Sequence, residues 1–411
     1  AVSLSDRLSI TNGFYIIMND VKVFGDLLNT AFLDPIQPYL EIDRIQQDTI
    51  WEQSQQFSKP RNCWQGYINR LCLETILPWL KDYDSQTHTA INSALLPSIW
   101  EFVTGTPIIF GQHRLILLPT EDISVDDMTI PQEWMDTRDW VGIWYLMAQI
   151  NLDEGWVRLI GFATHESIKR LGNYHWQDRT YNLPEVYWTR DWNILWLSQS
   201  ITATDTLQSP VSALSLPSID QAHSLIQRLG NSDIVIPRLA IPFIQWGALI
   251  SHDGWRQQLA ARRWDLPEQW SIRQWLQSGI SQLSQQLGWQ VYDLEASLSN
   301  ARGEEQNAIK VISRTLELAG QTYELQISPM ATEQTNTWRF ELKNISGDGQ
   351  IPPGFTLRLL TEDLQPFADN EDSATEAVES LYIEVSLLPG EGIVWETVPL
   401  PEVYQQEILR F

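Results

Sequence analysis

The stretch from Ile236 to Gly279 constrains the fold more than any other part of this sequence. Six tryptophans lie between Ile236 and Trp289, and apolar residues recur at the three- and four-residue steps of a helix face. Two polar breaks, Ser251–Gly254 and Asp265–Pro267, interrupt the pattern. The segment therefore predicts three tryptophan-bearing helices separated by two short turns.

Local signals set the expected ends of these helices. Pro242 suits a first helical turn, where a missing N–H costs nothing. Ser251 or Asp253 is expected to cap the second helix. The third helix is predicted to run as one amphipathic unit from Trp270 to a C-cap at Gly288.

The tryptophans allow two interpretations. Large aromatic side chains bury the most area per residue, which predicts that most of them form a core. Trp and Arg are also enriched at the centres of protein interfaces, and stacking of Arg on Trp fits both interpretations. The candidates for contact with a partner are Trp246, Trp255, Arg256, Arg262, Arg263, Trp264, Trp270 and Trp275.

The charge of the chain limits its partners. The net charge is −25, and a surface this acidic repels phosphates, so direct binding to nucleic acid is not expected. The charge is uneven: Val291 to Phe411 carries 21 acidic and 7 basic residues, whereas Gly230 to Gln290 carries 4 acidic and 5 basic ones. The balance suits solubility and docking to a basic protein.

Cysteine usage and hydropathy point to the cytoplasm. Cys63 and Cys72 are the two cysteines of the sequence, too few for a disulfide scaffold. They fall in a predicted amphipathic helix, Asn62–Leu80, which Pro78 is expected to bend or end. No signal peptide is recognised, and the longest apolar stretch, Ile234–Ile250, is too interrupted to span a bilayer.

The predicted fold class is α+β, with several parts. At 411 residues the chain is too long for one ordinary core. The predicted parts are a mainly helical region over residues 1–96, a small antiparallel sheet or partly closed barrel over 97–201, a linker over 202–229, a tryptophan-rich helical segment over 230–290 that packs on the preceding parts, and an acidic β-sandwich over 300–411.

Period-two alternation supplies the strands of this prediction. One hairpin is expected over Pro107–Leu118, with its turn at Gly111, and another over Ile143–Ala163, with its turn at Gly155. The other predicted strands are Arg179–Leu183, Trp192–Ser198, Ala308–Leu318, Gln321–Ser328, Thr337–Asn344, Phe355–Leu360, Leu381–Leu388 and Ile393–Val398. The insert Thr361–Ser380 carries seven acidic residues and no basic one, and is expected to be a loop or partly disordered. Short runs near Phe14 and Val21 fit either strand or helix.

No motif in the sequence marks a reaction. The run His165–Ser167 lacks the glycine-flanked serine of a nucleophile elbow, and is expected to start a helix or loop. The run His252–Gly254 is expected to be a turn between helices. Zinc-ligand spacing and phosphate-binding glycine loops are absent, and Asp369–Asp372 lacks the glycine and distal glutamate of a calcium loop. No cofactor, metal or small-molecule ligand is therefore predicted.

Two further functions stay open at this stage. A hydrolase site could assemble only in space, with Asp253, His252 and His165 as its first candidates. A carbohydrate-binding module could use Trp338 or Trp395 as a stacking platform.

Several phrases together resemble a known family. They are Asn69–Leu80, Pro97–Thr104, Ile130–Trp134, Asn151–Gly161, Asp178–Tyr181 and Pro237–Gln258. The chain is similar in these phrases to the cyanobacterial domain-of-unknown-function family 1822, over roughly Asn69 to Trp289 and more loosely beyond. The resemblance brings no catalytic residues. The resemblance implies that the gene lies near genes for sigma factors and caspase-like CHAT proteins, and therefore a cytoplasmic regulatory or adaptor role.

The leading hypothesis is thus a non-enzymatic interaction protein. It rests on the acidic composition, the lack of catalytic motifs and the implied context. The expected partner is another protein, with a basic regulator such as a sigma factor as the example.

Overall fold

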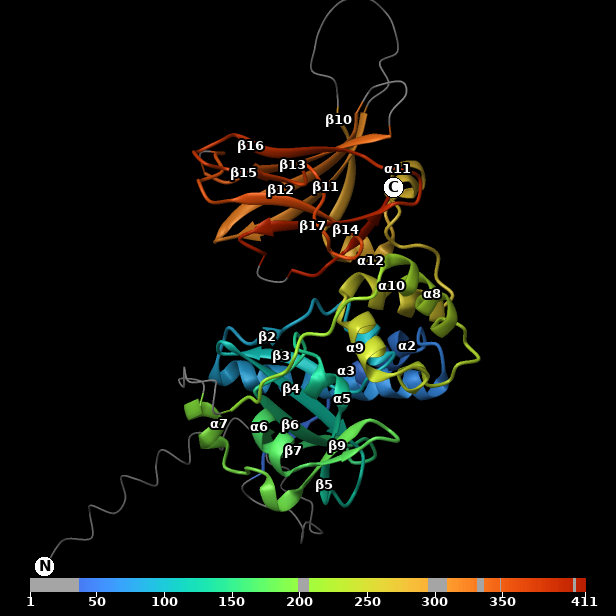
Figure 1. Ribbon diagram of the computed structural model, residues 1–411. Coiled ribbons are helices and arrows are strands. Elements are labelled where there is room, and N and C mark those ends of the chain that lie inside the picture. Colours follow the sequence, from blue (N-terminus) through green and yellow to red (C-terminus); the bar gives the residue numbers. More distant parts are fainter. Residues whose placement is uncertain (1–36, 199–206, 295–308, 331–335, 348, 402–403) are drawn as a thin grey trace, which may run out of the picture. The chain divides into compact units, whose positions relative to one another are not determined.

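The computed structural model describes residues 37–198, 207–294, 309–330, 336–347, 349–401 and 404–411. Tyr39–Phe411 forms one compact unit of mixed helices and sheets, as the predicted class requires in outline (Figure 1). The runs near Phe14 and Val21 lie outside the described residues. The division into five sequence segments stays a prediction.

A six-stranded sheet forms the centre of the first half of the unit. Its order is β1 (Tyr39–Glu41), β7 (Trp156–Thr164), β6 (Trp144–Asn151), β4 (His113–Thr120), β3 (Thr106–Phe110) and β2 (His88–Thr89). Both predicted hairpins are confirmed, with Gly111 and Gly155 at positive φ in their turns. The prediction of a purely antiparallel sheet is wrong, because β4 and β6 run parallel. The residues between them form a crossover, which parallel neighbours need.

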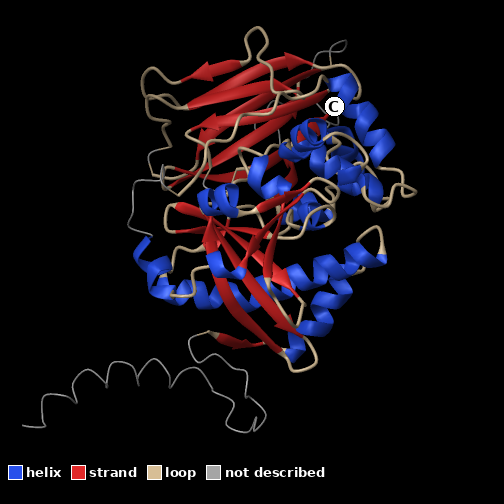
Figure 2. Cartoon of the chain, turned by 60° about the horizontal axis from the view of Figure 1, so that its bottom comes forward, coloured by secondary structure: helices blue, strands red, loops and turns tan. Residues whose placement is uncertain are grey.

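Helices α2 (Arg44–Ser54) and α3 (Pro60–Tyr83) lie in the region predicted to be mainly helical, and α3 contains the helix predicted over Asn62–Leu80. Helix α3 packs against β1, β3, β4, β6 and β7, and Figure 2 shows it lying across these strands. Pro78 does not end α3, which continues to Tyr83. Burial of Ile76 and Leu80 on either side of the proline stabilises that last turn and offsets the missing hydrogen bond.

Smaller elements extend this half. A three-stranded sheet has the order β5 (Asp127–Pro131), β9 (Thr180–Pro184) and β8 (Asn173–His175). The short helices are α4 (Pro97–Trp100), α5 (Gln132–Asp136), α6 (His165–Leu171) and α7 (Trp192–Ser198), with the 3₁₀ turn η1 (Glu185–Tyr187). The strand predicted over Trp192–Ser198 is wrong. Trp192 and Leu195 are both buried, and this three-residue step is that of a helix.

The tryptophan-rich segment is helical, as predicted. It contains η3 (Pro237–Leu239), α9 (Phe243–Ser251), α10 (Asp253–Arg263), α11 (Ile272–Ser278) and α12 (Gln282–Gln286), and α8 (Ile219–Leu229) precedes it within the predicted linker. A Ser218–Gln221 capping box starts α8. The single helix predicted from Trp270 is wrong, because Gly279 adopts φ 96° and separates α11 from α12.

Two antiparallel sheets occupy the C-terminal region. One has the order β10 (Trp289–Leu294), β11 (Ile309–Leu318), β12 (Gln321–Pro329), β13 (Thr337–Asn344) and β16 (Ser380–Ser386). The other has the order β15 (Glu371–Ser373), β14 (Thr356–Thr361), β17 (Gly392–Val398) and β18 (Ile408–Arg410). The six strands expected here are confirmed, whereas β10, β15 and β18 went unpredicted.

The acidic insert is more ordered than predicted. It supplies β15, and Val378 forms a bridge to Ile351. Glu362 and Asn370 are buried, and the amide of Asn370 donates to the Leu359 carbonyl. Backbone pairing and buried polar contacts therefore hold a segment whose composition alone suggested a loop.

The buried side chains form two clusters. The first joins the six-stranded sheet, α3 and the apolar faces of α8, α9 and α10. The second joins both C-terminal sheets with Trp270, Trp275 and Trp289. The tryptophan-rich segment thus contributes side chains to both clusters. Its part before the turn that follows α10 belongs to the first cluster, and its part after that turn belongs to the second.

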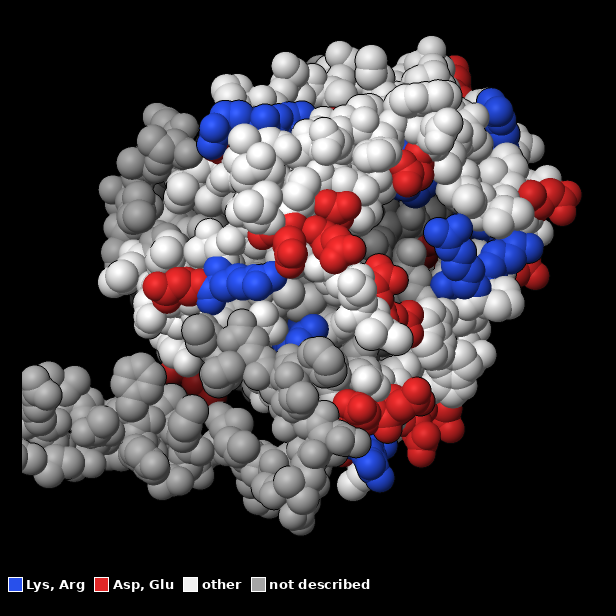
Figure 3. All heavy atoms as spheres, turned by 90° about the horizontal axis from the view of Figure 1, so that it is seen from below, with Lys and Arg blue, Asp and Glu red and all other residues white. Residues whose placement is uncertain are grey.

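One face of the molecule carries both acidic and basic side chains. Figure 3 shows acidic and basic side chains beside one another on the face viewed there, so the described residues of that face carry both signs of charge. In the described part of the chain, no helix is both long enough and apolar enough to cross a bilayer.

Candidate functional site

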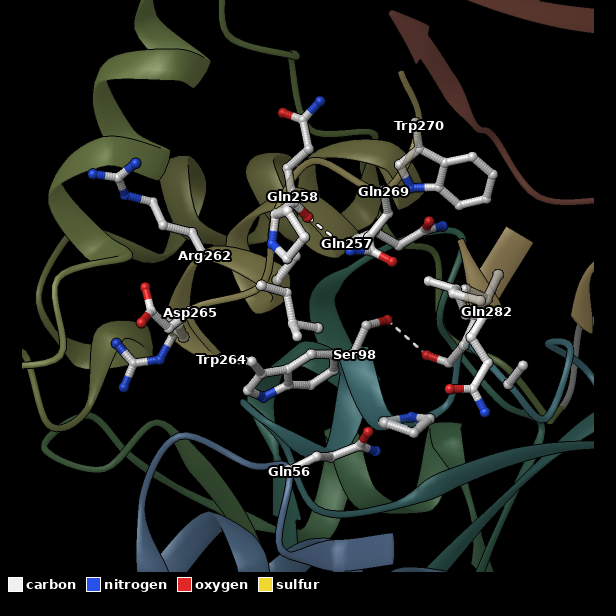
Figure 4. A pocket seen from close by; sticks show the side chains of 18 of the residues that line it. Gln56, Ser98, Gln257, Gln258, Arg262, Trp264, Asp265, Gln269, Trp270 and Gln282 are labelled. Carbon is white, nitrogen blue, oxygen red and sulfur yellow. Dashed lines mark hydrogen bonds between the residues drawn. The ribbon is translucent and has the colours of Figure 1, made fainter. Parts of the chain in front are cut away.

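A cleft of about 1320 Å³ opens where the N-terminal helices meet the tryptophan-rich segment. Its walls come from α2, α3, the segment from Asn92 to Ser98, α10, the turn after α10 and α12 (Figure 4). Small-molecule sites usually measure about 300–1,000 Å³ and are mostly apolar. This cleft is larger and polar, so it suits an extended ligand with many hydrogen-bonding groups.

Side-chain amides dominate the lining. The glutamines that line the cleft are Gln53, Gln56, Gln257, Gln258, Gln269, Gln282 and Gln286. Each carboxamide offers donors and acceptors together, so it can pair with a ligand group of either kind. The cleft is also lined by both signs of charge, with Arg70 and Arg262 on the basic side and Asp265 and Glu268 on the acidic side. It therefore differs from the strongly acidic average of the chain.

Gln257 is the one buried glutamine of this set, and Nε2 of the neighbouring Gln258 is also buried without a hydrogen-bond partner among the described residues. Gln257 is 4% exposed, and neither its Nε2 nor its Oε1 has a hydrogen-bond partner in the described part of the chain. Gln269, by contrast, donates from Nε2 to the Pro267 carbonyl over 2.7 Å, a bond drawn in Figure 4. A buried amide without partners costs about 1–3 kcal/mol relative to a satisfied one. The Gln257 amide is therefore free to bond a ligand, and without one it lowers the stability of the fold.

The backbone that carries Gln257 is firmly fixed. His252 caps α10, since its Nδ1 accepts from the Trp255 N–H over 3.3 Å. The cap is thus the histidine and not Asp253 or Ser251, which the sequence suggested. The next residue, Arg256, is buried and donates to Ser98 Oγ and to the Ile250 carbonyl.

Arg262 presents a cation on the cleft wall. The residue is exposed, and its guanidinium has no ion-pair or hydrogen-bond partner in the described part of the chain. Its aliphatic stem lies over Gly230, where an added Cβ would approach Arg262 Cδ to 2.4 Å. The missing side chain at residue 230 therefore makes room for the stem of this arginine.

Arg263, the residue after Arg262, turns inward onto the buried Glu101. Glu101 accepts from Arg263 Nε over 2.9 Å and from Trp264 Nε1 over 2.8 Å. Arg263 also donates to carbonyls at the end of α8, including Leu229. Charge-assisted hydrogen bonds of this kind are the stronger ones in proteins.

The same arrangement recurs. In the described part of the chain, four glutamates that are 2% exposed or less each accept from one arginine and one tryptophan indole. Besides Glu101, the groups are Glu133 with Arg238 and Trp246, Glu362 with Arg410 and Trp255, and Glu407 with Arg314 and Trp289. Each group joins elements distant in sequence, so these tryptophans serve the interior through both their rings and their N–H groups.

The Glu362 group ties the helices to the C-terminal sheets. Its carboxylate accepts from Trp255 of α10 over 3.0 Å and from Arg410 of β18 over 2.7 Å, and His223 of α8 lies 2.7 Å away. Burial raises the pKa of the Glu362 carboxyl, but the bonds and charges of Arg410 and His223 outweigh it and lower the pKa overall. Glu362 is therefore held as a carboxylate.

Most of the partner-contact candidates are buried. Trp246, Trp255, Trp270, Trp275, Arg256 and Arg263 are between 0% and 5% exposed. Trp264 is half-buried and Arg262 is exposed. Arg262, Arg263, Trp264 and Trp270 border the cleft, whereas the other four candidates do not line it. Contact with a partner is thus accessible in this conformation through Arg262 and Trp264.

Sequence reasoning missed the glutamines. Five of the seven lie between Gln257 and Gln286, inside the segment that the tryptophans had marked. A search for charged or nucleophilic residues passes over a neutral amide. The available signal was this density of glutamines in a near-neutral part of an acidic chain.

The residues weighed for hydrolysis do not come together. His165 Nδ1 accepts from the Ser209 N–H and Nε2 donates to the Met135 carbonyl, each over 3.0 Å. His252 is the helix cap. Burial lowers the pKa of His165, and it lowers that of His252 to about 4. Neither histidine lines the cleft, and each has a structural role among the described residues.

The remaining candidates for chemistry are also buried. Trp338 and Trp395 lie in the core, so they cannot serve as a sugar platform. Cys63 and Cys72 are free thiols inside α3, and burial raises the pKa of both. Within the described ranges, no three His, Cys, Asp or Glu residues are grouped to hold a metal ion.

Comparison with known proteins adds a family match. The model of a family described as "Protein of unknown function (DUF1822)" matches residues 40–410. The match extends further along the chain than the resemblance found in the sequence. No curated protein and no solved structure matches the chain.

Proposed function

Because the chain belongs to the DUF1822 family, whose function is unknown, we propose from its geometry that it is a binding protein that holds a partner protein in the glutamine-lined cleft. The observation that carries the proposal is the cleft itself, which is wide and lined by amides. A partner with many polar groups can exchange its bonds to water for bonds to these side chains.

The distribution of arginine and tryptophan supports this proposal. Interfaces commonly place Trp and Arg at their centre. Here Trp246, Trp255 and Trp289 of the glutamate groups are buried, which leaves Arg262, the half-buried Trp264 and the amides for a partner. The expected interface is therefore polar, and its affinity comes from many hydrogen bonds and not from one aromatic anchor.

A sugar ligand is the second candidate, because an amide-rich cleft also suits hydroxyl groups. Sugars, however, usually stack on an open aromatic face. Trp270 is 2% exposed, and the half-buried Trp264 has Phe57 against its ring. These contacts favour a protein ligand over a sugar.

The regulatory role and cytoplasmic location expected from the sequence belong to this proposal, as does a basic partner. The near-neutral cleft is compatible with a partner of either charge. We also propose that the two C-terminal sheets form the β-sandwich expected from the sequence. Their shared cluster of buried side chains supports that arrangement.

Site-specific photo-cross-linking tests the proposed function. A benzophenone amino acid replaces Gln286, an exposed residue of the cleft, or Gln277, an exposed residue of α11 outside it. We expect irradiation in native lysate to give a discrete adduct of protein size from the Gln286 variant alone. Equal adducts from both variants, or none from the cleft position, would contradict the proposal.

A further inference from the structure

We propose that the ligand of the cleft is an extended peptide segment, and that the Gln257 carboxamide turns outward to pair with the backbone N–H and C=O of one of its residues. This inference rests on the proposed function and names the form in which the partner enters. It is carried by the unsatisfied, buried amide of Gln257 in the cleft wall.

The bonding pattern of Gln257 matches one residue of an extended chain. A carboxamide presents a donor and an acceptor side by side, and the backbone N–H and C=O of one residue in an extended strand point to the same side. One Gln257 side chain can thus donate from Nε2 to a backbone carbonyl and accept at Oε1 from a backbone N–H. A lone hydroxyl or a carboxylate satisfies less of this pattern.

The required movement breaks no hydrogen bond. Both amide atoms of Gln257 are covered in the unliganded wall and have no partner among the described residues. Rotation about the side-chain torsions therefore exchanges an unsatisfied position for a bonded one. The backbone does not have to follow, because the His252 cap and the bonds of Arg256 fix α10.

The other walls suit a chain that continues past Gln257. Gln258 adds a second amide on α10, and Gln282 and Gln286 add two more from α12, as Figure 4 shows for Gln258 and Gln282. Extended chain advances about 3.3 Å per residue, so a cleft of this size receives several residues. Neutral amides bond the backbone of the peptide and do not select a charge, so we expect the cleft to tolerate many different peptide side chains.

A displayed library of random twelve-residue peptides, panned on the full chain, tests this proposal. We expect enriched peptides that compete with the partner adduct at Gln286. Gln257→Met keeps the length and helix preference of the side chain but removes both hydrogen-bonding atoms. We expect it to weaken binding about tenfold without lowering the melting temperature, whereas Gln277→Met leaves binding unchanged.

Backbone N-methylation then locates the paired group. Methylation of one peptide nitrogen should weaken binding to the wild-type chain but cause no further loss in Gln257→Met. If methylation at every position weakens both proteins equally, Gln257 has no such role. If neutral oligosaccharides on an array bind and peptides do not, the peptide proposal is overturned.

The two proposals fail in different ways. An adduct at Gln286 that no peptide displaces leaves the binding function standing and removes the extended peptide. Absence of both the adduct and any enriched peptide removes both.

Discussion

Arg263 Nε donates to Glu101 Oε1 over 2.9 Å, and both side chains are closed to solvent. The pair joins α10 to the end of α4, and Arg263 borders the cleft. A sequence search that treats arginine as a surface residue misplaces it. The remaining bonds of Arg263, to carbonyls at the end of α8, show that the guanidinium organises three elements at once.

Removing the charge of Glu101 should destabilise the chain severely. Glu101→Gln keeps the shape but leaves Arg263 as an uncompensated buried cation, so we expect a loss of about 3–5 kcal/mol in unfolding free energy. Urea denaturation measures it. Glu185→Gln, in the exposed pair with Arg190, is the control and should change stability by less than about 1 kcal/mol.

The indole of Trp255 should contribute to stability through its N–H. Trp255→Phe removes the bond to buried Glu362 and part of the ring, so we expect a loss of at least about 2 kcal/mol. Trp64 also donates to a carboxylate, Glu121, but on the surface. Trp64→Phe should cost clearly less in the same denaturation experiment. Equal losses would mean that the buried bond has no special weight.

Acid should weaken the fold before the carboxylates titrate. The pKa of His252 is lowered by burial from 6.5 to about 4. Between these values the unfolded chain binds a proton that the folded chain excludes, so stability falls as pH drops through this window, by up to about 3 kcal/mol. The lowered pKa of His165 acts in the same direction. The contribution of Glu362, whose pKa is lowered from 4.5, is lost as the pH falls below about 4.5, and so begins to add at the lower end of that window.

His252→Asn provides the matching variant, because asparagine caps a helix without gaining a charge. Denaturation at a series of pH values should show a flatter profile for it between pH 6.5 and 4. His175→Asn, at an exposed position, should keep the wild-type slope. An unchanged slope in His252→Asn would show that other groups set the acid response.

Gly254 should resist any side chain. An added Cβ would lie 2.5 Å from Ile408 Cγ1, where α10 meets β18. We expect Gly254→Ala to destabilise the chain by about 1–3 kcal/mol through overpacking. Ile408→Ala removes the opposing atoms, so the double variant should lose less than the sum of the single losses. Strict additivity would exclude this contact as the cause.

Periodicity predicted the strands and helices that have one clear buried face. The hairpins at Gly111 and Gly155 and the alternating strand β13 are examples. Elements that depend on distant partners were missed. Strand β18 has three residues, and its place is set by pairing with β17 and by the Arg410 contact to Glu362. No local pattern carries that information.

The candidate site shows the same division. The tryptophan-rich segment was correctly marked as the centre of organisation, and its residues do border the cleft. The direction in which a tryptophan of this segment points depends on the carboxylate that it binds. Glu101 binds Trp264, Glu133 binds Trp246 and Glu362 binds Trp255. Each of these glutamates lies more than 90 positions away from its tryptophan in the sequence. Composition allowed both a core and a partner-contact role for Trp and Arg, and buried carboxylates bind Trp246 and Trp255 in the interior.

The two buried thiols of α3 can be used to measure how often this helix opens to solvent. Cys63 and Cys72 are its two cysteines and both are enclosed, so a thiol-reactive dye should label the native state slowly. Labelling then proceeds at the rate at which the long helix leaves the central sheet. A cysteine introduced on the rim of the cleft would, by comparison, react at once. A single dye could therefore label the cleft selectively, before the two native thiols react.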